Sequence, residues 1–302
     1  VKVNQFVISH PLDQENVLQI TLEDLNGMLL QEYYLQMGSG NGYCKNDFVI
    51  TEQDSTPILT SILDNATVFR VRINDPGISQ LTVRYYQRDF PIAVPPFWNE
   101  QAPNYTYQAD SLFVVTLDET WSDELNFPAT GIYQFQVDTS FRTGKSVFRF
   151  YEGFPQISSP ERLLEPLRYI TTAEEYDEIK AQEDLKVAVD RFWLDNAGNP
   201  MRAKNMIKKF YSRVVDANKL FSSYLEGWKT DRGLIYIIFG PPNIVYRANF
   251  YEEWIYGEAG NSNSIKFQFT QVDNPFTDND FTLYRMPSYK EKWYNVVAGW
   301  RR

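Results

Sequence analysis

The feature that most constrains the fold is a continuous apolar run at residues 234–239, Leu-Ile-Tyr-Ile-Ile-Phe. Gly227 and Gly233 precede the run, and glycine permits backbone conformations that are closed to residues with a Cβ. Gly240 and Pro241 follow it, and proline lacks the N–H that a β-ladder needs. An unbroken apolar run rich in isoleucine and aromatic residues is typical of a strand buried on both faces. We therefore predict a central strand between two turns.

The hydrophobic period predicts a multi-domain chain in which β-rich segments precede a helical one. Residues 1–42 contain strand-like runs around Asn26-Gly27, a tight-turn signal, and end in a linker. The strands are interpreted as the end of a truncated β-sandwich, or alternatively as an addition to the sheet of the next domain. Residues 43–154 have the short, regularly spaced strands of an immunoglobulin-like β-sandwich. Residues 155–302 change to a helical period and then return to strands, which predicts an α+β domain with helices packed on a small antiparallel sheet.

The expected strands of the sandwich alternate apolar and polar residues, as half-buried strands do. The single cysteine, Cys44, excludes the subtype of immunoglobulin fold that is held by an internal disulfide. The strands are predicted at residues 47–50, 68–73, 81–87, 111–117, 131–137 and 145–151.

Helix-start signals recur in the last domain. Ser159-Pro160 and Asn199-Pro200 each place a capping residue before proline at the first helical position. Thr172 and Glu175 have the spacing of a capping box. We predict helices beginning at these three points, another over 185–193, a terminal helix within 287–300, and strands at 251–256, 265–270 and 281–284.

Residues 227–233 read Gly-Trp-Lys-Thr-Asp-Arg-Gly, which resembles the signature of the GWxTD domain family. The similarity covers residues 160–285, although Asn243 stands where the family pattern leads us to expect Asp. The resemblance implies a secreted or lipid-anchored envelope protein, typical of Bacteroidetes-like bacteria, with no established chemistry. The residues that carry it are Gly227, Trp228, Thr230, Asp231, Arg232, Gly233, Gly240, Pro241 and Trp254.

Composition excludes several classes of function. With one histidine, His10, and one cysteine, the chain lacks the residues for a His-based hydrolase or a Cys/His zinc site. Residues 1–152 hold 9 Lys and Arg against 19 Asp and Glu, which argues against nucleic-acid binding. No glycine-rich phosphate loop is present, so no cofactor is predicted.

The start of the sequence, Val1-Lys2, has neither Met nor a signal peptide, and no apolar run reaches the length of a membrane span. We expect an upstream signal or lipid-bearing cysteine in a longer protein. The predicted location is extracytoplasmic, in the periplasm or associated with the outer membrane.

Paired carboxylates are the one catalytic arrangement that the composition leaves open. Asp231 with Glu252 or Glu253 would suit a hydrolase, because two close carboxylates can separate their pKa values. The competing interpretation is structural: Asp231 caps its own turn, Arg232 pairs with a nearby acid, and Trp228 fills the seam between helices and sheet. We favour the structural reading. Three further acids, Asp273, Asp278 and Asp280, lack the spacing of an EF-hand, so a solvated loop is expected rather than a Ca²⁺ site.

Two surfaces are candidates for binding. The proline-rich segment 91–107 holds Phe97, Trp98, Tyr105 and Tyr107, which could dock a partner, stack on sugars, or simply pin the loop down. A basic helix face follows, with the residues Arg202, Lys204, Lys208, Lys209 and Arg213. Such a face is usually solvated, but it could also dock an acidic surface.

Together these patterns favour a non-catalytic scaffold or accessory subunit of a bacterial cell-envelope assembly that acts by protein–protein binding. The alternatives are the carboxylate-dependent hydrolase and a carbohydrate-binding module that uses the aromatic loop. The scaffold hypothesis predicts an exposed aromatic or charged patch and no deep polar pocket.

Overall fold

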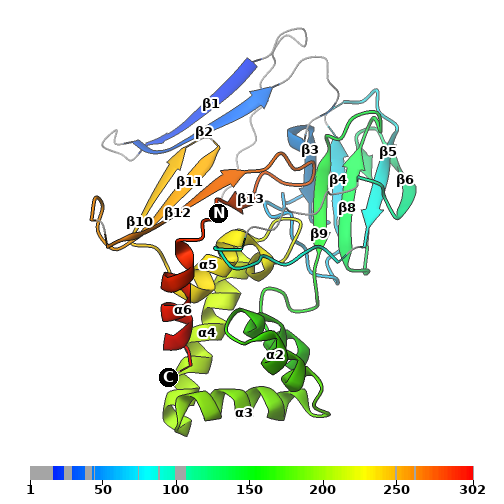
Figure 1. Ribbon diagram of the computed structural model, residues 1–302. Helices are drawn as coiled ribbons and strands as arrows, with labels where there is room; N and C mark the ends of the chain where they lie inside the picture. Colours follow the sequence, from blue (N-terminus) through cyan, green and yellow to red (C-terminus); the bar gives the residue numbers. More distant parts are fainter. Residues whose placement is uncertain are drawn as a thin grey trace. The chain divides into compact units, whose positions relative to one another are not determined.

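A computed structural model of the chain separates into two compact units (Figure 1). The first unit comprises Val1–Gln87 and Ala109–Arg149, and the second comprises Arg88–Gln108 and Phe150–Arg302. His10, the Asn26-Gly27 turn, the linker before residue 43, and Cys44 lie outside the described residues. The residues that the structure describes are 16–23, 29–37, 43, 45–73, 75–87, 89–98, 107–248, 250–261 and 263–301.

A separate hairpin opens the first unit. β1 (Asn16–Glu23) pairs antiparallel with β2 (Leu29–Met37), and the register shifts between Leu22 and Glu23. Both strands lie where the strand-like runs on either side of Asn26-Gly27 predict them.

The rest of the first unit is a β-sandwich. Its strands follow the antiparallel order β3-β4-β7-β6-β5-β8-β9. β6 pairs with β5 and with β7, so it belongs to both halves of the sandwich. The six predicted strands are confirmed to within a few residues, whereas the two-residue β7 was missed. The elements are a 3-10 turn, η1 (Lys45–Asp47), followed by β3 (Phe48–Thr51), β4 (Arg70–Ile73), β5 (Gln80–Tyr86), β6 (Ser111–Asp118), β7 (Trp121–Ser122), β8 (Gly131–Gln136) and β9 (Lys145–Arg149).

The segment after β3 brings the sheet close to a closed barrel. The Ile58 N–H donates to the carbonyl oxygen of Ile50 in β3 at 2.8 Å. A few residues on, the Phe148 N–H of β9 donates to the carbonyl oxygen of Ser61 at 2.7 Å. The segment therefore pairs with both outer strands, which occupies edges that would otherwise be open to other chains. Side chains such as Phe69 and Val83 fill the interior and are fully buried.

The helices of the second unit begin where the capping signals predict. Ser159 caps α1, Asn199 caps α4, and both hydrogen bonds of the Thr172–Glu175 capping box are present. The predicted terminal helix is also confirmed. The elements are α1 (Pro160–Leu164), η2 (Glu165–Tyr169), α2 (Ala173–Lys180), α3 (Leu185–Ala197), α4 (Pro200–Phe221), η3 (Gly227–Lys229), α5 (Asp231–Phe239) and α6 (Tyr289–Gly299).

The sheet of the second unit has four antiparallel strands, as the α+β prediction requires. They are β10 (Ile244–Ala248), β11 (Tyr251–Tyr256), β12 (Ile265–Gln271) and β13 (Phe281–Leu283), in that spatial order. Figure 1 shows α5 and α6 on one side of this sheet. Trp254, Phe267 and Phe269 bury their side chains in the core shared with those helices. β10 was missed, because its mainly exposed residues show no burial pattern.

The predicted strand at residues 234–239 is wrong: these residues form most of α5. Thr230 is extended and its Oγ1 accepts a hydrogen bond from the Gly233 N–H at 3.1 Å, which starts a helix. Gly240, with φ of 89°, ends the helix. Because the apolar side chains of α5 are buried around nearly the whole circumference, the run has no 3.6-residue period, and periodicity alone cannot distinguish such a helix from a strand.

Candidate functional site

The family-like signature forms a tight corner between α4 and α5. A Cβ at Gly227 would lie 1.8 Å from the carbonyl oxygen of Ala217, and a Cβ at Gly233 would lie 1.8 Å from that of Gly227. Neither glycine has a positive φ. The expectation that these glycines serve an unusual backbone conformation is therefore wrong. They are needed because three backbone segments touch.

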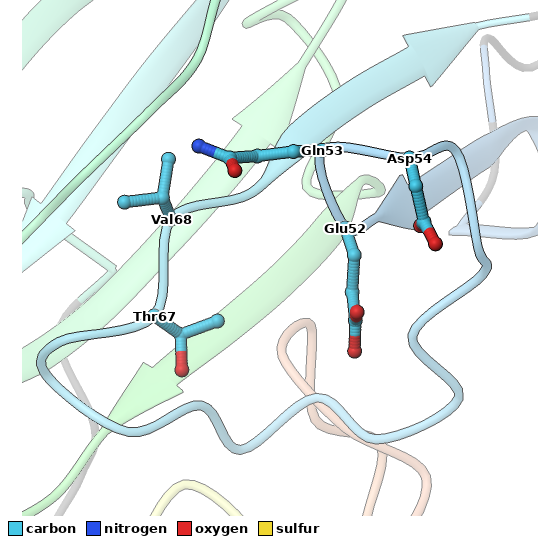
Figure 2. A pocket seen from close by; sticks show the side chains of 5 residues that line it. All are labelled: Glu52, Gln53, Asp54, Thr67 and Val68. Carbon is cyan, nitrogen blue, oxygen red and sulfur yellow. The ribbon is translucent and has the colours of Figure 1, made fainter.

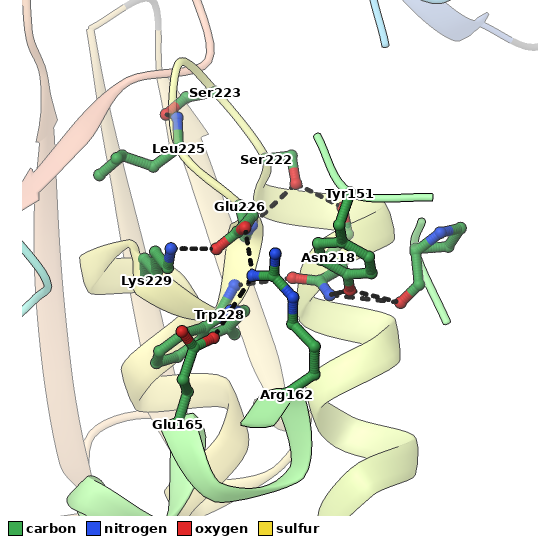
Figure 3. A network of polar contacts seen from close by, with 12 residues as sticks. Tyr151, Arg162, Glu165, Asn218, Ser222, Ser223, Leu225, Glu226, Trp228 and Lys229 are labelled. Carbon is green, nitrogen blue, oxygen red and sulfur yellow. Dashed lines mark hydrogen bonds and ion pairs between the residues drawn. The ribbon is translucent and has the colours of Figure 1, made fainter. Parts of the chain in front are cut away.

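Side chains from α4 and from Ser222, the residue that ends it, hold the backbone of this corner (Figure 3). The Trp228 N–H donates to Asn218 Oδ1 at 3.1 Å, and the Gly227 N–H donates to Ser222 Oγ at 2.8 Å. Asn218 Nδ2 in turn donates to the Tyr151 hydroxyl at 3.2 Å. Tyr169 donates its hydroxyl hydrogen to the Trp228 carbonyl oxygen at 2.9 Å. The Trp228 side chain is 1 % exposed in the core of the unit, so the corner is a packed, hydrogen-bonded joint.

A buried carboxylate, Glu226, sits beside this joint between two cations. Its Oε1 lies 3.2 Å from an Arg162 nitrogen, and its Oε2 pairs with the Lys229 ammonium group. The Arg162 guanidinium also lies 4.1 Å from the ring centroid of Tyr151. Burial raises the pKa of the Tyr151 hydroxyl, and the charge of Glu226 raises it further. The cluster is therefore an internal charge network.

Asp231 is held by the end of β13. Its carboxylate makes a two-point ion pair with Arg285, with Arg285 NH1 3.0 Å from Oδ2. The Leu283 N–H donates to the same oxygen at 2.7 Å. The expectation that Asp231 caps its own turn is wrong, because Thr230 is the cap and Asp231 joins the helix to the sheet.

The other two candidate carboxylates, Glu252 and Glu253, pair with cations other than Arg285. Glu252 Oε1 lies 3.4 Å from buried Arg232 and 3.3 Å from Arg247, while its Oε2 accepts from Trp254 Nε1 at 3.0 Å. Glu253 lies 3.7 Å from the Lys266 ammonium nitrogen. Arg232 thus pairs with an acid as predicted. Burial lowers the pKa of Arg232 to about 10, although the negative charge of Glu252 acts to raise it. Asp231, Glu252 and Glu253 each engage different cations.

The acidic loop before β13 contains a half-buried carboxylate, Asp280. Asn274 Nδ2 donates to Asp280 Oδ2 at 2.9 Å, and burial raises the pKa of this carboxyl group above its usual value. The main-chain carbonyl of Asp278 accepts from Gln271 Nε2 at 2.6 Å. Across the described residues, no three His, Cys, Asp or Glu side chains are grouped closely enough to hold a metal ion.

The described part of the aromatic loop, residues 89–98 and 107, packs on its own unit. The Phe97 ring centroid lies 5.5 Å from that of Tyr294, and the Tyr107 centroid lies 5.8 Å from that of Phe276. Trp98 remains 53 % exposed, and Tyr105 lies outside the described residues.

Main-chain hydrogen bonds fix the same loop beside the signature. The Ala93 N–H donates to the Lys229 carbonyl oxygen at 2.8 Å. Arg285, the partner of Asp231, donates to the Val94 carbonyl oxygen at 3.2 Å. The loop is therefore anchored to η3 and to the Asp231 ion pair.

The basic residues of α4 divide into two groups. Arg202, Lys204 and Lys208 are exposed. Lys209 is also exposed, and its ammonium nitrogen lies 5.3 Å from the Trp300 ring centroid. Arg213 donates to the carbonyl oxygens of Ile237 and Ile238 at 2.9 and 3.1 Å, so it caps the C-terminal end of α5. Arg202, Lys204, Lys208 and Lys209 therefore form an open basic surface, whereas Arg213 is half-buried and engaged by the fold.

A depression of about 440 Å³ lies in the first unit (Figure 2). Its lining residues are Glu52, Gln53, Asp54, Thr67 and Val68. The Thr56 N–H donates to the Asp54 carboxylate at 2.9 Å, which lowers the pKa of that group. None of the lining residues belongs to the signature or to the predicted site residues.

Sequence reasoning missed the residues that support the corner from a distance. Arg285 lies 54 positions after Asp231, and Asn218 lies 10 positions before Trp228. Asn279 donates its side-chain amide to the Ser222 carbonyl oxygen across 57 positions. No local pattern marks such pairs. The sequence signal that was available was the signature itself, residues 227–233, whose buried polar groups would need partners elsewhere in the chain.

Of the comparisons with known proteins, one gave a match. In the described part of the chain, no helix combines the length and apolarity that crossing a membrane requires. Comparisons with curated proteins and with solved structures found no match. The sequence model of the GWxTD domain matches residues 131–302, more than half of the chain and including the corner described above. The chain belongs to the GWxTD domain family.

Proposed function

We propose that this protein is a non-catalytic scaffold or accessory subunit of a bacterial cell-envelope assembly, of the outer-membrane or secretion type, acting by protein–protein binding. The observation that carries the proposal is that the signature's polar groups are engaged internally. Trp228, Asp231 and Arg232 are buried or nearly buried and have partners within their own unit. A site that is fully occupied by its own fold leaves recognition to other surfaces.

Two such surfaces are available in the second unit. Exposed Arg202, Lys204 and Lys208 project from α4, and Trp98 is half exposed on the anchored loop. An acidic partner surface would complement the basic face and increase the rate of association. An aromatic side chain held on a fixed backbone is a suitable anchor, because little conformational entropy is lost on binding.

The proposed location is extracytoplasmic, in the periplasm or associated with the outer membrane. This location rests on the family resemblance. The sandwich of the first unit is proposed to be immunoglobulin-like, a type of domain suited to extracytoplasmic scaffolds.

Affinity purification from native envelopes in mild detergent tests the proposal. The tagged wild-type chain is expected to recover defined envelope proteins, identified by mass spectrometry. The double variant R202E/K208E should lose an acidic partner, while R191E/K290E, which reverses two other exposed charges, should keep it. Recovery of the wild-type chain alone would contradict the proposal.

The same preparations separate the two alternatives. A hydrolase would lose activity toward a substrate panel on D231N or E252Q, whereas the scaffold hypothesis expects no turnover in any variant. A carbohydrate-binding module would be retained on a glycan array through Trp98, and W98A would release it. No contact in the described residues favours either alternative over the scaffold.

A further inference from the structure

The outer edge of β10 is an unpaired strand edge. β10 is the first strand in the order β10-β11-β12-β13, and no other described strand pairs with its far side. Tyr246 is 51 % exposed, and the Arg247 side chain is 72 % exposed. An open edge presents backbone N–H and C=O groups to which another strand can add.

The register identifies which backbone groups face outward. The Gln271 N–H donates to the Phe250 carbonyl oxygen at 2.8 Å, which continues the β11–β12 ladder. Bonding groups alternate along an antiparallel strand, so Tyr251, Glu253 and Ile255 direct theirs toward β10. Their partners in β10 are Ala248, Tyr246 and Ile244. The backbone groups of Val245 and Arg247 therefore point to the free edge.

The edge lacks the usual protection against pairing. Natural edge strands carry lysine, proline or bulges. β10 has no proline, and its register with β11 runs without a shift. Its one charge, Arg247, has its Nε 3.3 Å from the Glu252 carboxylate. The second unit is also close to neutral, with 21 Lys and Arg against 23 Asp and Glu, so charge repulsion between copies of this unit is small.

We propose that β10 pairs antiparallel with β10 of a second copy of this chain, with the two-fold axis at Tyr246. In this register Val245 faces Arg247 of the second copy, and all the outward N–H and C=O groups of both residues form hydrogen bonds. Tyr246 faces Tyr246 at a non-hydrogen-bonded position, where side chains are closest. The two four-stranded sheets become one continuous sheet.

Self-complementarity selects a second copy over an unrelated strand. No like charges face each other, because Arg247 lies opposite Val245. The central Tyr–Tyr pair is a favourable cross-strand contact. The small contact area predicts a weak dimer. The inference does not depend on the proposed envelope role, because it concerns the purified chain alone.

Sedimentation equilibrium of the purified chain tests the hydrogen bonds. Wild type should dimerise as concentration rises. V245P removes an outward N–H that makes no bond within the monomer, so the variant should still fold. The dissociation constant of its dimer should rise by about tenfold or more. V245T keeps the N–H and should dimerise like wild type. A monomer at every concentration, or a dimer unaffected by V245P, would overturn the proposal.

Charge substitution tests the register. V245E places a carboxylate opposite Arg247 of the second copy and should strengthen the dimer in low salt, whereas V245K should weaken it. Equal effects of the two substitutions would refute this pairing.

Crosslinking tests the two-fold axis. In a C44S background, Y246C should form an intermolecular disulfide on mild oxidation, because facing residues of a non-hydrogen-bonded pair are close enough. Q268C, on the exposed face of β12, is the control and should not crosslink. A disulfide at Q268C with none at Y246C would overturn the proposed axis.

Discussion

The carboxylate of Asp231 and the guanidinium of Arg285 form a two-point ion pair that fastens the start of α5 to the residue two positions after β13. Their side chains are 10 % and 14 % exposed, so water screens the pair only weakly. Arg285 also reaches the Val94 carbonyl oxygen, which adds the proline-rich loop to the same joint. One signature residue thus connects a helix, a sheet and a loop.

Removing one member of this pair should be costly. D231N leaves the Arg285 guanidinium largely buried without its counter-charge, which should lower the free energy of unfolding by about 3 kcal/mol. E253Q, which breaks the more exposed pair with Lys266, should cost less than about 1 kcal/mol. Urea unfolding followed by circular dichroism measures both, and equal losses would contradict the role assigned to Asp231.

The close contacts of Gly227 predict a large difference in stability between two glycine-to-alanine variants. G227A places a methyl group against the Ala217 carbonyl oxygen, a backbone atom that cannot move aside. We expect a loss of more than about 3 kcal/mol or no folded protein. G198A is the matched control, because Gly198 has φ of 73° but no atom within 4 Å of the added Cβ. It should cost about 1–2 kcal/mol. Thermal melts compare the two variants.

The N-cap of α5 can be tested separately. T230A removes the acceptor for the Gly233 N–H and the donor to the Gly227 carbonyl oxygen. Loss of the cap should cost about 1–2 kcal/mol. T230S keeps the hydroxyl group and should stay close to wild type in chemical denaturation. A T230A protein as stable as wild type would mean that the cap does not hold the helix.

Asp280 predicts a pH dependence of stability. Burial raises the pKa of this carboxyl group in the folded state above its unfolded value of 3.8. The folded protein therefore binds the proton more tightly, and the contribution of Asp280 to stability falls as pH rises from 3.8 through the folded pKa. D280N cannot ionise, so its stability relative to wild type should increase across that window and then level off. Unfolding measured from pH 4 to pH 8 checks this, and a constant difference would contradict it.

Much of the fold could be predicted because its signals are local. Ser159, Thr172 and Asn199 start helices through hydrogen bonds to residues three positions away. The strands of the sandwich could be predicted equally well from the alternation of apolar and polar residues. By contrast, the apolar run at 234–239 is buried on all sides, so it carries no period, and the Thr230 cap decided its structure.

The joint around the signature could be predicted only in part. The sequence indicated that Arg232 needs an acid and that Trp228 is buried. It could not identify Arg285 or Asn218, because a side-chain contact between distant residues leaves no spacing to recognise. The roles of Thr230 and Asp231 were confused for the same reason: adjacent residues look alike as caps until the distant partner is known.

The C-terminal end of α5 is completed by two parts of the chain that are synthesised at very different times. Arg213, upstream, donates to the carbonyl oxygens of Ile237 and Ile238, while the Trp300 indole, 62 residues downstream of Ile238, donates to the latter at 3.1 Å. While Trp300 is still inside the ribosomal exit tunnel, this end of the helix has the hydrogen bonds from Arg213 but lacks the one from Trp300. The last turn of α5 therefore gains its full set of hydrogen bonds only after Trp300 has emerged from the ribosome.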